Sequence, residues 1–132
     1  MKTVFADTLF YVALLSRRDR LHSAARRWAS QRHSRVATTE FVLLEVANFF
    51  KRPKDRQKFA AFVQSLRASP VTTIVPCDSI WFRKGLERFT ARLDKEWSLT
   101  DCISFVVMEE HRLTEALTDD HHFKQAGFTV LL

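Results

Sequence analysis

Four acidic residues of this chain stand beside apolar segments, where a bare carboxylate is costly. They are Asp7, Glu45, Asp101 and Asp120. Glu45 is the most informative, because every other residue of the run 41–50 except Asn48 is apolar. A charge in such surroundings loses hydration and needs a compensating partner. Three further acids placed nearby could share a divalent cation with Glu45, and carboxylates around such a cation suit chemistry on phosphate groups.

Each acid also has a purely structural interpretation. Asp7 could cap a following helix, and Asp101 fits the third position of a capping box. The doublet Asp119-Asp120 is typical of a turn after a strand. Glu45 gains nothing from capping in the middle of a helix, so its alternative is an internal salt bridge to an arginine. These alternatives are separate coincidences, whereas one metal site accounts for all four acids.

Apolar periodicity and turn residues predict the elements that carry these acids. Strands are expected over 3–6, 35–38, 71–75, 115–118 and 128–131. Helices are expected over 9–15, 22–32, 39–50, 55–67, 78–93 and 98–111, with a short turn or helix over 120–125. Strands that alternate with helices imply crossover connections. The predicted fold class is therefore α/β, a three-layer α/β/α sandwich with a mainly parallel sheet of four to five strands.

In open parallel sheets, functional sites form outside the carboxyl ends of the strands. Asp7 follows the first predicted strand directly, and Asp120 follows the fourth. Glu45 lies about two turns into the helix that leaves the second strand. The helix of Asp101 must enter the fourth strand at its amino end, so its own start lies at the opposite edge. We therefore expect the four acids to converge on the carboxyl edge of the sheet.

Composition favours one compact domain over residues 1–132. The chain is 46% hydrophobic with 12 Phe, and only two Gly and three Pro argue against linkers or disorder. No segment approaches the length of a membrane span, and Asp7 comes too early for a signal peptide. Cys77 and Cys102 show neither disulfide nor zinc spacing, which favours reduced core thiols in a cytoplasmic protein.

The net charge of +6 suggests a polyanionic partner, since a basic exterior around an acidic pocket suits an enzyme acting on a phosphate polymer. The arginines of 17–20 and Lys124 could contact phosphates, although each could equally be a solvated charge. Trp81 and Trp97 could stack on bases, although Trp within a helical stripe is usually part of the core.

Four blocks of the sequence together resemble the PIN domain family. They are the first strand with Asp7-Thr8, the segment from Thr39 to Glu45-Val46, the segment 97–105 with Ser-Leu-Thr-Asp-Cys, and the segment 116–128 with Leu-Thr-x-Asp-x-His-Phe. The combination is most similar to VapC-type toxins of bacterial toxin–antitoxin pairs and their solitary relatives. The resemblance covers essentially the whole chain.

The resemblance implies that Asp7, Glu45, Asp101 and Asp120 form a catalytic site that binds Mg²⁺ or Mn²⁺. Asp120 is preferred over Asp119 because the family acid stands three residues before a Phe, with Asp119 as the alternative. The implied activity is metal-dependent endoribonuclease cleavage of RNA phosphodiester bonds by the toxin of a VapBC-type pair. The implied partners are RNA, a cognate antitoxin and a second copy in a homodimer.

Elementary electrostatics predicts how the four acids and their polar neighbours would share the work of metal binding. Four neighbouring acids cannot all ionise cheaply, so at least one pKa should rise without metal. We expect Asp7 and Asp101 to be the principal ligands, while Glu45 and Asp120 ligate directly, bind through water or orient the attacking water. Hydroxyls of Thr8, Ser98 and Thr100 would cap helices or hold carboxylates in place. Asn48 could face the pocket or simply be a polar residue at a helix end. His121 and His122 could touch substrate or metal, but adjacent histidines on a turn are more often at the surface, so they are placed outside the core site.

Three other functions remain open at this stage. A PIN-like module without catalysis could hold RNA or a protein, and a solitary PIN nuclease could act without an antitoxin. A DNA nuclease of flap or exonuclease type uses the same acidic logic, but a chain of 132 residues has little room for the additional elements of such enzymes. The apolar stripes of the helices at 21–32 and 55–67 are candidate dimer or antitoxin surfaces.

Overall fold

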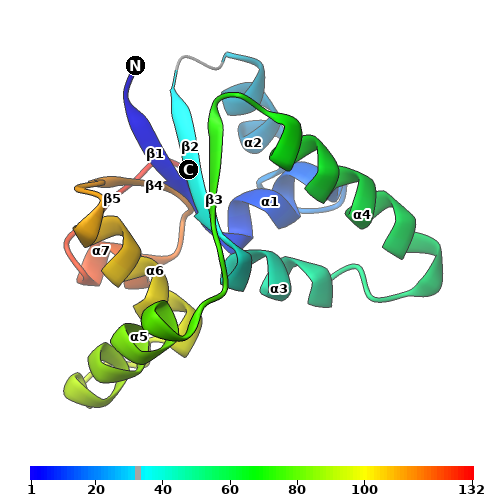
Figure 1. Ribbon diagram of the computed structural model, residues 1–132. Coiled ribbons are helices and arrows are strands. Elements are labelled where there is room, and N and C mark those ends of the chain that lie inside the picture. Colours follow the sequence, from blue (N-terminus) through cyan, green and yellow to red (C-terminus); the bar gives the residue numbers. More distant parts are fainter. Residues whose placement is uncertain (32–33) are drawn as a thin grey trace.

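A five-stranded sheet organises the computed structural model, which describes residues 1–31 and 34–132 (Figure 1). The strand order is β3-β2-β1-β4-β5, and each neighbouring pair is parallel. The strands are β1 Thr3–Ala6, β2 Arg35–Thr39, β3 Thr72–Val75, β4 Glu115–Leu117 and β5 Thr129–Val130. The predicted α/β class with a parallel sheet is therefore confirmed, and the sheet is parallel throughout.

Helices cover both faces of this sheet. In Figure 1, α1 to α4 lie on one side of the sheet and α5 to α7 on the other. The helices are α1 Thr8–Leu15, α2 His22–Ser30, α3 Glu40–Asn48, α4 Pro53–Ala68, α5 Ser79–Ala91, α6 Leu99–Glu110 and α7 His121–Gln125. β1, β2 and β4 lead directly into α1, α3 and α7 near their carboxyl ends, so the first turns of these helices start from one edge of the sheet.

Helix α6 is the most deeply buried helix of the fold, and this fixes the place of the acid it carries. Residues 101–108 are all buried. Phe105 contacts the rings of Trp97 and Phe123 edge-on, with centroid distances of 5.0 Å in both pairs. Close-packed aromatic contacts restrict both the rotation and the shift of a helix. Asp101 at the start of α6 is therefore held on a rigid element, and Trp97 belongs to the core.

Three sequence expectations differ from the structure or fall beyond it. The helix expected over 55–67 begins two residues earlier, because Pro53 is the first residue of α4, where its missing N–H leaves no helical hydrogen bond unmade. Cys77 was expected in the core, but it is exposed after β3 and donates its N–H to Glu40 Oε1 at 2.8 Å. Arg32, the expected end of the second helix, lies outside the described residues.

Within residues 1–31 and 34–132, no helix combines the length and apolarity needed to cross a membrane.

Candidate active site

The four predicted acids line one cavity at the carboxyl edge of the sheet. Its volume is about 510 Å³, and its walls come from α1, α3, the start of α6 and the turn before α7. Besides Asp7, Glu45, Asp101 and Asp120, the lining residues are Thr8, Leu9, Asn48, Phe49, Glu96, Ser98 and His122. Residues up to 113 positions apart in the chain, from Asp7 to Asp120, thus meet as the parallel topology predicts.

Asp7 is almost fully buried, with 3% of its surface exposed, and occupies the N-cap position of α1. Its carboxylate makes no capping hydrogen bond to that helix and instead accepts one from Thr118 Oγ1 at 3.1 Å. Burial raises the pKa of Asp7 to about 7, and the negative charges of Asp101 and Glu45 add to this rise. The capping interpretation therefore leaves the side chain of Asp7 unexplained.

Glu45 is held from α1 by a single short hydrogen bond. Thr8 Oγ1 donates to Glu45 Oε1 at 2.6 Å. Thr8 directly follows Asp7, so the same turn presents one acid and positions another. Among the ion pairs of residues 1–31 and 34–132, none joins Glu45 to an arginine. The salt-bridge alternative for Glu45 thus has no support within the described chain.

Asp101 forms the expected capping box with Ser98. The Ser98 hydroxyl accepts from Asp101 N at 2.9 Å, and Asp101 Oδ2 accepts from Ser98 N at 3.2 Å. The two interpretations of Asp101 are compatible, because the same carboxylate also lines the cavity. Burial raises the pKa of Asp101, and repulsion from Asp120 and Glu45 contributes to the rise. The capping box fixes the rotamer of the acid, as a site residue requires.

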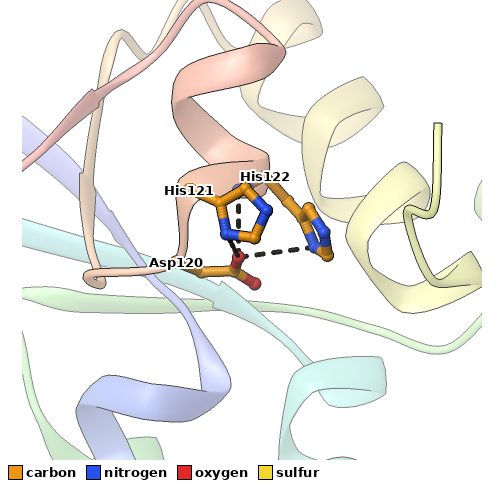
Figure 2. Close-up of side chains that lie close together, drawn as sticks. All are labelled: Asp120, His121 and His122. Atoms are coloured by element: carbon orange, nitrogen blue, oxygen red, sulfur yellow. Dashed lines mark hydrogen bonds and ion pairs between the residues drawn. The ribbon is translucent and has the colours of Figure 1, made fainter.

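Asp120 caps the short helix α7 and stands beside two imidazoles. Its Oδ1 accepts from His122 N at 2.9 Å and lies 3.4 Å from His122 Nδ1 and 3.7 Å from His121 Nδ1. Figure 2 shows both imidazole rings next to the Asp120 carboxylate. His122 Nδ1 also lies 3.3 Å from Asp101 Oδ2. His122 therefore bridges two of the four acids.

The doublet Asp119-Asp120 divides its roles between surface and cavity. Asp119 pairs with the exposed Arg20, from the α1–α2 connection, and does not line the cavity. Asp120 lines the cavity, and Thr118 Oγ1 accepts a hydrogen bond from its N–H at 3.0 Å. This arrangement favours Asp120 as the fourth acid of the site.

The family assignment rests on sequence comparison. A model of the PIN domain matches residues 4–129 of this chain. The chain belongs to the PIN domain family. The 23S rRNA-specific endonuclease VapC20 of Mycobacterium tuberculosis is 27% identical over 125 residues, which cover 95% of each chain. The expected resemblance is therefore confirmed at the level of the family.

Solved structures extend the likeness of this PIN domain to three dimensions. The crystal structure of M. tuberculosis VapC20, described as a sarcin–ricin loop cleaving toxin, matches with a TM-score of 0.84 at 26% identity and covers 96% of both chains. FitAcB from Neisseria gonorrhoeae matches with a TM-score of 0.67 at 17% identity, covering 98% of this chain and 96% of that one. The second likeness concerns the fold alone.

Two groups of donors in this PIN domain could hold a cation. The four carboxylates offer hard oxygen ligands of the kind that Mg²⁺ and Mn²⁺ prefer. Asp120, His121 and His122 form a second, overlapping group whose ligand atoms lie within 4.8 Å of one another. Within the described parts of the chain, no Lys or Arg pairs with any of the four acids. A divalent cation is the charge that would relieve their mutual repulsion.

Sequence reasoning missed four residues of the cavity wall: Leu9, Phe49, Glu96 and His122. His122 was expected at the surface, but the capped start of α7 turns its ring back toward Asp101. Phe49 follows α3 and leaves 60% of its surface exposed. The sequence signal for His122 was its place two residues after Asp120, and that for Phe49 was an aromatic ring one residue beyond Asn48, a candidate that lines the cavity. No sequence signal distinguished Glu96 from its charged neighbours.

Proposed function

We propose that this PIN domain is a metal-dependent endoribonuclease that hydrolyses RNA phosphodiester bonds as the toxin of a VapBC-type pair. The observation that carries the proposal is the cavity in which four carboxylates meet with no Lys or Arg pairing them in the described chain. RNA as the substrate is supported by relatedness to a 23S rRNA-specific endonuclease at 27% identity over 95% of both chains.

The donor set fits a hard divalent cation, Mg²⁺ or Mn²⁺, held by Asp7 and Asp101, with Glu45 and Asp120 nearby. When bound, this cation supplies an activated water nucleophile and neutralises charge on the scissile phosphate. The Thr118 hydroxyl donates to the Asp7 carboxylate and the Ser98 backbone N–H donates to the Asp101 carboxylate, and these bonds hold both carboxylates in position. The cation also favours the ionised form of Asp7, whose pKa burial otherwise raises to about 7.

Glu45 and Asp120 are placed to act on water and on the neighbouring ligands. Thr8 holds Glu45 through a hydrogen bond of 2.6 Å, which leaves its second carboxylate oxygen able to accept a proton from an attacking water. Asp120 and Asp101 flank His122 Nδ1, which donates to carboxylates when protonated at that atom. His122 thereby sets the spacing between the two acids.

The partners of the protein follow from the same proposal. Besides RNA, we expect a cognate antitoxin, because the VapC20 relative is described as a toxin and a structural neighbour with a TM-score of 0.67 is a toxin–antitoxin complex from Klebsiella pneumoniae. A homodimer and a cytoplasmic location remain predictions. The solitary nuclease is distinguished by the absence of a binding partner when the neighbouring small open reading frame is coexpressed.

Metal removal is the direct test of the proposed activity. Purified protein is incubated with RNA and, in parallel, with a DNA oligonucleotide of the same sequence. We expect RNA cleavage with Mg²⁺ or Mn²⁺, complete loss in EDTA and recovery when the metal is added back in excess. Cleavage that persists in EDTA contradicts the metal-dependent mechanism. Cleavage of DNA alone favours the DNA nuclease, and metal-dependent RNA binding without cleavage favours the non-catalytic module.

Replacing His122 tests how the two acids are spaced. His122→Ala removes the Nδ1 group between Asp101 and Asp120, and we expect Mn²⁺ affinity measured by calorimetry to fall about 10- to 100-fold. His122→Asn is the matched control, because its amide nitrogen can occupy the place of Nδ1 and should retain most of the affinity. Equal affinities in both variants and the wild type would remove His122 from the site.

A further inference from the structure

A dense cluster of cations stands at the corner between α3 and α4. We call it the basic arm and define it as Lys51, Arg52, Lys54, Arg56 and Lys58. Segment 49–58 holds these five cations and one acid, Asp55, so it carries +4 of the chain's net +6. All five side chains are exposed. In Figure 1 the corner between α3 and α4 extends away from the sheet, so this charge faces solvent.

The last two cations of the basic arm, Arg56 and Lys58, bind backbone carbonyls, while the first three remain able to bind an anion. Arg56 Nε donates to Lys51 O at 2.7 Å, and Lys58 Nζ donates to Leu15 O at 3.1 Å. Arg52 lies 3.4 Å from Asp55, an exposed pair that contributes little to stability. These two hydrogen bonds tie two long side chains to backbone carbonyls and help to fix the shape of the corner.

Several of these cations sit where the helix dipole opposes them. Arg52 is the N-cap residue of α4 and makes no side-chain capping bond, while Lys54 and Arg56 lie in its first turn. A helix start carries partial positive charge and favours acids, so cations there are unfavourable. The same addition of charges produces a strongly positive end that attracts anions. Cations at the start of α4 therefore do not stabilise the helix, but they favour the binding of phosphate groups.

The basic arm follows the cavity directly in the chain, since Lys51 stands two residues after Phe49, which lines the cavity. Helix α3 carries Glu45 and ends at Asn48, and both residues line the cavity together with Phe49. Only Phe50 separates Phe49 from Lys51. A strand of RNA whose cleaved phosphate lies against the acids therefore has an exposed aromatic ring and then a row of cations along one direction. Aromatic rings that are open to solvent beside a basic groove are typical stacking platforms for unpaired bases.

We propose that the basic arm binds the phosphate backbone of the RNA beside the cleaved bond, and that Phe49 stacks on an unpaired base between the arm and the acids. The inference rests on the proposed ribonuclease function and adds the element that holds the substrate. The expected substrate is an RNA with an unpaired base next to the cleaved bond and with backbone phosphates beyond that base that reach the start of α4.

The test measures RNA binding apart from cleavage. In an Asp7→Asn background, anisotropy of a fluorescein-labelled RNA hairpin is titrated at several salt concentrations, with and without Lys51→Gln, Arg52→Gln and Lys54→Gln together. We expect at least about a tenfold loss of affinity and a salt slope that is smaller by about 2, because three phosphate contacts disappear. The matched control is Arg26→Gln, Arg27→Gln and Arg35→Gln, exposed cations on α2 and at the start of β2, which should change neither value appreciably.

Phe49 is tested with two RNAs. Phe49→Ala should weaken binding of the hairpin about tenfold, while binding of a fully paired duplex of the same length changes little. Unchanged affinity and salt slope in the arm variant, or an equal loss in the α2 control, overturns the inference. Cleavage by the wild-type protein is followed in parallel. Cleavage with an inert arm refutes only this inference, whereas arm-dependent binding without any cleavage refutes the proposed nuclease instead.

Discussion

We expect Asp7→Asn and Asp101→Asn each to reduce metal-dependent RNA cleavage by at least about a hundredfold. The expectation follows from the loss of one ionisable oxygen donor from a cavity whose other donors are fixed in place. Asn keeps the size of the side chain, and its carbonyl oxygen can still accept the Thr118 or Ser98 hydrogen bond seen in the structure. The fold should therefore survive, so that lost activity reports on the site.

Asp119→Asn is the matched control for these variants. It removes the same charge one residue from Asp120, but Asp119 pairs with Arg20 outside the cavity. We expect cleavage rates within about twofold of wild type, since an exposed ion pair is worth little. The measurement is the initial rate of cleavage under saturating Mn²⁺, with circular dichroism to check folding. Near-normal rates in Asp7→Asn, or a loss in Asp119→Asn equal to that in Asp101→Asn, would disprove the assignment.

The convergence of the acids was predictable because it depends on topology. Parallel strands with short connections bring Asp7 and the residues after β4 to one edge, whatever the details of packing. Glu45 stood out for a related reason, since an acid inside an apolar helix needs a partner. Such arguments use spacing and polarity, which a sequence displays directly. They required no knowledge of any side-chain direction.

The features of the fold and the site that the sequence did not predict depend on contacts between distant residues or on local turns. The choice between Asp120 and Asp119 is informed by Arg20, which is 99 positions away in the chain. His122 enters the cavity because Asp120 caps α7 and reverses the chain there, a rotation that periodicity does not fix over five residues. Cys77 is exposed in the loop after β3, where it follows Pro76. The preference of cysteine for the core does not predict this, because exposure there depends on where the strand ends.

We expect the free energy of unfolding of the metal-free protein to fall as pH rises, with Asp7 as the main cause. Its ordinary pKa is 3.8, and burial raises the pKa in the folded state to about 7. Between these values the unfolded chain has released the proton while the folded protein retains it. The unfolded state therefore binds fewer protons, and stability decreases with pH until both states are ionised above about pH 7.

The size of the effect follows from the pKa values. Between about pH 5 and about pH 8, the free energy of unfolding falls only up to the folded pKa of about 7, that is, over roughly two pH units. At about 1.4 kcal/mol per unit, the expected decline is about 3 kcal/mol. Glu40 and Asp94 have lowered pKa values, so their contributions are lost only in more acidic solution and do not offset the decline. Asp101, whose pKa burial also raises, acts in the same direction as Asp7.

Asp7→Asn should remove most of this pH dependence and leave the metal-free protein about 4 kcal/mol more stable than wild type near pH 8, because the full shift of the pKa from 3.8 to about 7 then acts against the wild type. Urea unfolding in EDTA near pH 5 and pH 8 measures the free energy of unfolding of both proteins. The difference between variant and wild type removes the contributions of the other titrating groups, which the two proteins share. Asp119→Asn should retain the decline. Mn²⁺ added near pH 8 should stabilise the wild type and not Asp7→Asn, because a cation that binds only the folded site stabilises that state. A variant that is less stable than wild type near pH 8 would show that the buried charge is already compensated without metal.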